Sequence, residues 1–117
     1  MIWSIYLKIY VEKGYNALGG VRAVDIETWS QFKTVVRQLK SDNAKEIYKN
    51  IIIDTADIAY DSCEKFILGQ HGVENISDIP YGQGWGLVEK EFDSVLRSIV
   101  MNGYGLVIIS HDEDKTF

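Results

Sequence analysis

The chain has 117 residues, 46% hydrophobic and 25% charged, which is the length and balance of one globular domain. Its formal net charge of −5 excludes nucleic-acid binding through overall charge, so any such role requires a local basic patch. The single cysteine, Cys63, excludes an internal disulfide and a zinc site of several thiolates, and we expect a reducing, cytoplasmic location.

The first apolar run, residues 2–11, includes Lys8 and has no basic region before it, so it predicts a strand and not a signal peptide. No run of about 18 apolar residues occurs, and we expect no membrane contact. Further β-branched or aromatic runs predict strands at residues 21–26, 50–54 and 104–110.

Helical spacing separates these strands. Apolar residues three and four apart between Trp29 and Leu39 predict a helix, with Thr28 and Gln31 as a capping box. Two more helices are predicted, one from about residue 56 to 68 and one from Trp85 to the exit signal Asn102-Gly103. The basic residues of the first helix, Lys33, Arg37 and Lys40, share its polar side, which we expect to be a solvated face.

The order of these elements predicts the fold class. Strands that are joined by helical crossovers favour a parallel sheet. The runs "NIIID" and "GLVIIS" lack polar alternation, as expected for strands covered on both faces. We therefore predict a three-layer α/β fold, a mainly parallel sheet flanked by helices, as a single domain over residues 1–117.

Polar residues at the ends of the predicted strands are candidates for one shared edge of the sheet, because ligands bind there in such folds. Asp54 ends the run of three isoleucines and precedes Thr55. A carboxylate in this place suits Mg²⁺ shared with substrate phosphates. The alternative is that Asp54 caps the following helix, where Asp and Thr are both favoured.

Glu12, Ser110 and His111 complete the expected edge. A glutamate at a strand end can orient and deprotonate an attacking water, and the alternative is an exposed acid in a turn before Gly14. Polar residues after the last strand can sense a γ-phosphate. His111 could also lie on the surface or bind a metal, although the other histidine, His71, fits no metal-binding pattern.

A phosphate-binding loop of the form G-x-x-x-x-G-K-[ST] is absent from the 117 residues. The string "GYNALGGV" places Gly14 and Gly19 at the right spacing, but Gly20 and Val21 stand where the lysine and the hydroxyl residue belong. This string predicts a turn between two strands.

The ordered set "IIIDT", "YGQGWG…EF" and "GYGLVIISH" resembles the phage-encoded, RecA-like P-loop nucleotide-binding proteins, over nearly the whole chain from about residue 9. The resemblance implies that "IIID" is the Walker B strand and that Asp54 acts on Mg²⁺ directly or through water. It implies that Glu12 is the base and His111 the polar sensor, with Thr55 and Ser110 beside the nucleotide. The family's acid two residues before this glutamate is replaced by Tyr10.

The same resemblance implies ATP and Mg²⁺ as ligands, ATPase activity, and a role in DNA recombination and single-strand annealing, with single-stranded DNA as a partner in a bacterial or phage-infected cell. In that family a phosphate loop precedes the first strand and more strands follow "SH". We therefore expect a partial, truncated or split RecA-like domain that is inactive alone.

Its sheet should have an open apolar edge near residues 104–110, completed by a second copy or a partner chain. Two alternatives remain: a non-catalytic α/β binding or assembly module, and a small metal-dependent hydrolase or nuclease without a phosphate loop.

Overall fold

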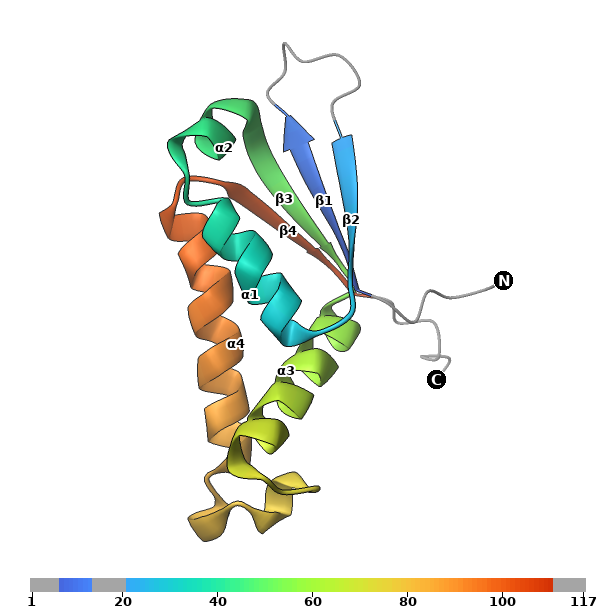
Figure 1. Ribbon diagram of the computed structural model, residues 1–117, viewed down its shortest axis with the longest axis vertical. Coiled ribbons are helices and arrows are strands. Elements are labelled where there is room, and N and C mark those ends of the chain that lie inside the picture. Colours follow the sequence, from blue (N-terminus) through green and yellow to red (C-terminus); the bar gives the residue numbers. More distant parts are fainter. Residues whose placement is uncertain (1–6, 14–20, 111–117) are drawn as a thin grey trace, which may run out of the picture.

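The computed structural model describes residues 7–13 and 21–110 (Figure 1). None of the helices in this part of the chain is long and apolar enough to cross a membrane. In chain order the elements are β1 (Leu7–Lys13), β2 (Val21–Ile26), α1 (Trp29–Gln38), α2 (Asp42–Ile47), β3 (Tyr48–Asp54), α3 (Ala56–His71), the short 3₁₀ helices η1 (Ile76–Asp78) and η2 (Pro80–Gly82), α4 (Gly84–Met101) and β4 (Gly105–Ile109).

The four strands form one mixed sheet in the order β2-β1-β3-β4. β1 runs antiparallel to both β2 and β3, and β3 runs parallel to β4. The prediction of a mainly parallel sheet is therefore wrong. Only seven residues separate β1 from β2, which is too few for a crossover helix, so these strands pair as antiparallel neighbours.

One face of the sheet is covered by helices. Alternate residues of β1 and β3 point to this face, and Ile9, Ile51 and Ile53 are at most 1% exposed. Figure 1 shows α1, α3 and α4 on the same side of the sheet. On the opposite face Ile52 is half-buried and Val107 is 51% exposed. The described part of the chain thus has two layers, and the prediction of three is wrong.

The central strand β3 and the edge strand β4 differ in how far they are buried. β3, which contains "NIIID", lies between β1 and β4, so its predicted place in the interior of the sheet is confirmed. β4 is an edge strand, and three of its apolar residues remain exposed: Val107, Ile108 and Ile109. The open apolar edge is confirmed, whereas the expected cover on both faces is wrong for "GLVIIS". It is wrong for "NIIID" too, because the described helices cover only one face and Ile52 on the other is half-buried.

Helix α1 begins at the predicted cap and directs its apolar side to the sheet. The Thr28 Oγ1 accepts a hydrogen bond from the Gln31 N–H at 3.1 Å, and the Gln31 side chain accepts one from the Glu27 N–H at 2.7 Å. Trp29 and Phe32 are buried, with ring centroids 4.9 Å apart. The apolar spacing and the cap signal together determine this helix.

Helix α2 was not predicted. It has six residues and none of them is buried, so it has no apolar stripe that a periodicity could reveal. Its one clear signal is Ser41, whose side chain accepts a hydrogen bond from the Ala44 N–H at 3.2 Å. Helix α3 is three residues longer than predicted and ends at Gly72, which adopts the left-handed conformation common after helices (φ 64°).

Candidate functional site

Asp54 is the last residue of β3, the strand that pairs with both β1 and β4. Its neighbour Ile53 points into the helix-covered core, so the Asp54 side chain points to the opposite face of the sheet. In the parallel register Asp54 lies beside Ile109, which places Ser110 at the same edge. The expectation that Asp54 and Ser110 share one edge is confirmed. Asp54 is half-buried and Ser110 is exposed.

Thr55, not Asp54, caps helix α3. The Thr55 backbone is extended, and its Oγ1 accepts a hydrogen bond from the Ile58 N–H at 3.3 Å. The alternative in which Asp54 merely caps the helix is therefore wrong. Thr55 is 8% exposed, and its hydroxyl keeps its own proton as a donor because capping uses only an oxygen lone pair. The peptide bond between Asp54 and Thr55 is cis.

A row of charged residues crosses three strands on the face that carries Asp54. Lys8 of β1 lies directly opposite Asp25 of β2 and Asp54 of β3. Residues directly opposite each other in antiparallel strands lie on the same face. The Lys8 Nζ lies 3.3 Å from an Asp25 carboxylate oxygen. The candidate site therefore has an ammonium group between two acidic strand positions.

Sequence reasoning missed Lys8 and Asp25 as members of this edge. Their signal was the alternation of "KIYVEK" and "VRAVDI" around a short connection, which is typical of a hairpin and would have set the register. Glu27 was missed too. It directly follows β2, whose carboxyl end lies at the same edge as that of β3, and it is exposed.

Glu12 lies at the other end of the sheet. It pairs with Asn50, the fifth residue from the end of β3 counting Asp54, and this offset of four residues is about 13 Å along a strand. The expectation that Glu12 shares an edge with Asp54 is wrong, because β1 runs antiparallel to β3. The Glu12 side chain is not among those that the structure describes, so its catalytic role stays a prediction without support from the register.

His111 lies outside the described residues, and its role as a sensor stays a prediction. Among the residues that the structure does describe, no group of three or more His, Cys, Asp or Glu side chains gathers as a metal cage. Mg²⁺ needs no such cage, since it commonly binds one or two carboxylates, substrate phosphates and water. Asp54 and the exposed Ser110 at the same edge fit this open type of site, whereas Thr55 is only 8% exposed and its hydroxyl caps α3.

Cys63 has no part in the candidate site. It is fully buried in α3, and its thiol donates to the Val88 carbonyl oxygen at 3.5 Å. Burial, reinforced by the charge of Glu91, raises the pKa of Cys63 to about 12. Because the thiolate is the nucleophilic form, Cys63 is inert at neutral pH.

Comparison with known proteins places this arrangement in a family. A curated relative, the "SPbeta prophage-derived uncharacterized protein YorG" of Bacillus subtilis (strain 168), is 35% identical over 108 residues, which cover 89% of this chain and 33% of that protein. The chain thus spans about one third of the length of this relative. No solved structure matches. The family model of the AAA domain matches residues 5–117, and the chain belongs to the AAA domain family.

Proposed function

We propose that this chain is the part of a RecA-like ATP-binding domain that carries the metal-binding carboxylate, with Asp54 holding Mg²⁺ against the phosphates of ATP. The observation that carries the proposal is the place of Asp54. It ends the strand between β1 and β4, lies level with the end of parallel β4, and leaves the capping of α3 to Thr55. Membership of the AAA domain family supports it.

Each residue of the edge has a role in this proposal. When bound, Mg²⁺ would neutralise phosphate charge and hold the phosphate chain in place. The carboxylate of Asp54 binds the ion or one of its water molecules, and the hydroxyl groups of Thr55 and Ser110 contact the same shell or the phosphates. Lys8 contributes a positive charge near the phosphates. His111, which follows Ser110, is the proposed sensor.

Tight binding of the ATP phosphates requires a glycine-rich phosphate-binding loop with its lysine, and these 117 residues contain no such loop. We therefore propose that a partner chain or another part of a longer protein supplies this loop, and that ATP hydrolysis belongs to the complete assembly. We further propose that this assembly acts in phage DNA recombination or single-strand annealing, in the cytoplasm of a bacterial host. Similarity to a prophage-derived protein supports only the phage origin in this proposal.

A second candidate function is a non-catalytic binding or assembly module. The exposed edge strand β4 favours it, because an open row of backbone N–H and C=O groups with apolar side chains readily pairs with another chain. In this alternative Asp54 and Ser110 keep their places but bind no nucleotide.

A titration with ATP, with and without Mg²⁺, tests the proposal. We expect weak binding, with a Kd of about 1 mM, because the phosphate loop is missing. This binding should depend on Mg²⁺, and Asp54→Asn should abolish that dependence. The matched control is Asp42→Asn, which removes an exposed carboxylate at the opposite end of β3 and should change nothing. Mg²⁺-dependent binding that survives in Asp54→Asn would contradict the proposal, and no binding at all would favour the assembly module.

A further inference from the structure

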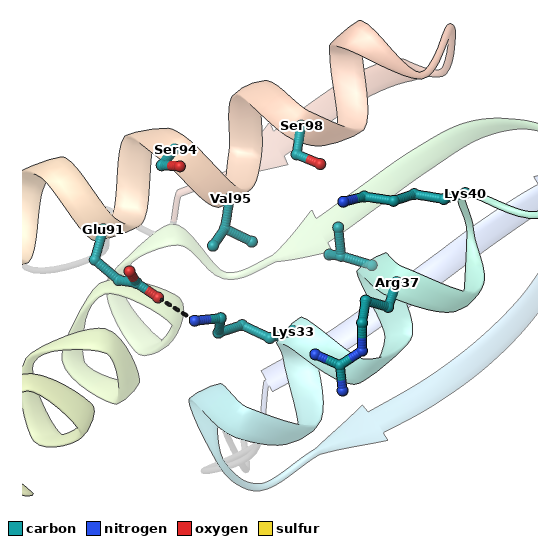
Figure 2. Close-up of a pocket in the computed structure, with 8 residues that line it drawn as sticks. Lys33, Arg37, Lys40, Glu91, Ser94, Val95 and Ser98 are labelled. Carbon is teal, nitrogen blue, oxygen red and sulfur yellow. Dashed lines mark ion pairs between the residues drawn. The ribbon is translucent and has the colours of Figure 1, made fainter. Parts of the chain in front are cut away.

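A groove with a volume of about 310 Å³ lies between α1 and α4, on the helix layer and away from Asp54 (Figure 2). Helix α1 and the turn after it provide three basic residues, Lys33, Arg37 and Lys40, at successive turns. Figure 2 shows Lys33 and Lys40 extending towards α4, where Ser94 and Ser98 provide hydroxyl groups. The basic face that was expected to be merely solvated therefore lines a groove.

A second groove of about 430 Å³ continues this surface over α4. It shares Ser94 and Ser98 with the first groove and adds the basic residues Lys90 and Arg97. We call the lining of both grooves the α1–α4 surface. It holds five of the twelve Lys and Arg residues but only two of the seventeen Asp and Glu residues. On a chain of net charge −5, this surface is a local basic patch.

Much of this positive charge is not neutralised by the protein. Lys33 pairs with Glu91 at 2.9 Å, and Arg97 pairs with Asp93. In the described part of the chain, Arg37, Lys40 and Lys90 form no ion pair. An ordinary solvated helix face often places acids three or four residues from its bases, but residues 29–40 contain neither Asp nor Glu. An anionic ligand would supply the missing charge.

We propose that the α1–α4 surface binds the phosphate backbone of single-stranded DNA. Residues 90–101 span about 17 Å of helix, which matches about five backbone charges of one strand. The lining offers cations and hydroxyl donors, the usual partners of phosphates, and no aromatic ring on which a base could stack. Contact is therefore with the backbone, without base preference, and a groove between two helices admits one strand more readily than a duplex.

The choice of DNA among polyanions rests on the proposed function, but the surface is separate from the Asp54 edge. Asp54 points to the face of the sheet that lacks described helices, whereas the α1–α4 surface belongs to the helix layer. A test without ATP and Mg²⁺ therefore examines DNA binding alone. If DNA does not bind, the proposal that Asp54 binds Mg²⁺ and ATP still stands. If the ATP titration is negative, DNA binding by the α1–α4 surface can still be measured.

Fluorescence anisotropy with a labelled oligothymidine of about 30 nucleotides, at about 50 mM salt, tests the inference. The double variant Arg37→Glu/Lys40→Glu should weaken binding at least about tenfold and lower the slope of log K against log salt by about 1.4. The matched control Lys45→Glu/Lys49→Glu makes the same charge change outside the surface and should retain affinity within about threefold. Circular dichroism checks that each variant is folded.

Three results would overturn the inference. If the wild-type protein does not bind the oligonucleotide, the α1–α4 surface is not a DNA-binding site. Equal losses in the two double variants would mean that overall charge, and not the groove, controls binding. Duplex DNA bound as tightly as the single strand would contradict a groove that selects one strand.

Discussion

The two faces of the sheet differ in what they contribute. The face under α1, α3 and α4 presents Ile9, Ile51 and Ile53, all essentially inaccessible to water. The opposite face carries Lys8 and Asp54 in its charged row, together with exposed apolar residues of β4. Burial of apolar area therefore stabilises the fold from one face, while the candidate chemistry lies on the other. Substitutions on the two faces should affect stability and binding separately.

The largest difference should come from neighbouring isoleucines of β3. Ile53→Ala removes a fully buried side chain and should lower the free energy of unfolding by about 3 kcal/mol through lost burial and a cavity. Ile52→Ala, on the other face, should cost about 1 kcal/mol because its side chain is only half-buried. Urea denaturation measures both. Equal costs would mean that something in solution also covers the second face.

A glycine pair tests how tightly the helix layer is packed. A Cβ atom on Gly84 would clash with the Cγ2 atom and the carbonyl oxygen of Ile76, whereas one on Gly86 would meet nothing within 4 Å. Gly84→Ala should therefore cost about 2 kcal/mol. Gly86→Ala should stabilise the protein by about 0.5–1 kcal/mol through helix propensity. Thermal and urea unfolding check both, and a neutral Gly84→Ala would contradict the close packing of η1 against α4.

A pH-dependent contribution should come from Glu91, which is 22% exposed. Burial alone would raise the pKa of Glu91, but hydrogen bonds from Trp29 and Lys33 and the charge of Lys33 outweigh it, so the pKa lies below its usual value. A lowered pKa in the folded state adds stability above the unfolded pKa of about 4.3, and this stability is lost as the pH falls through the folded pKa.

Glu91→Gln should therefore lower the free energy of unfolding by about 1–2 kcal/mol at pH 7, and the difference from wild type should disappear in acid. The control Glu89→Gln changes an exposed carboxylate on the same helix and should have no such effect. Urea denaturation at several pH values measures the difference. A gap between wild type and Glu91→Gln that persists at the lowest pH would contradict the ion pair as its cause.

The smallest effect on stability should occur at the exposed edge. Val107→Lys should change the free energy of unfolding by less than about 0.5 kcal/mol, because Val107 is 51% exposed. It should nevertheless reduce self-association, since lysine on an edge strand discourages pairing with another chain. Ala23→Lys, at the exposed β2 edge, is the control and should leave association unchanged. Sedimentation velocity measures self-association of both variants. Equal self-association of Val107→Lys and Ala23→Lys would contradict a role for β4.

Local patterns predicted most of the elements but not how they assemble. Helical spacing and the cap at Thr28 determine α1, and the run of isoleucines determines β3, because these signals act within one segment. Strand direction depends on partners distant in sequence. A turn was predicted between the first two strands, but the fold class was derived from the helical connections alone, which made the sheet mainly parallel and placed Glu12 beside Asp54. The short connection between β1 and β2 instead gives antiparallel pairs. The two carboxylates are consequently at opposite ends.

The candidate site was predictable where it depends on one strand pair. Asp54 and Ser110 end two strands that a helical segment separates, so their parallel pairing and common edge follow from connection length. Lys8 and Asp25 lie in one row with Asp54 only because of the register in which β1 pairs with β2 and β3. The pattern of one strand does not reveal this register. The α1–α4 surface likewise required the packing of two helices that are distant in sequence.

Paramagnetic broadening by Mn²⁺, which substitutes for Mg²⁺, can locate the proposed metal at Asp54. In amide NMR spectra recorded with ATP present, we expect selective broadening of Asp54, Thr55 and Ser110, the residues where β3 and β4 end. The same residues should remain sharp in Asp54→Asn. Broadening centred at the opposite end of the sheet, near Asn50, or unchanged broadening in Asp54→Asn, would contradict a metal site at this carboxylate.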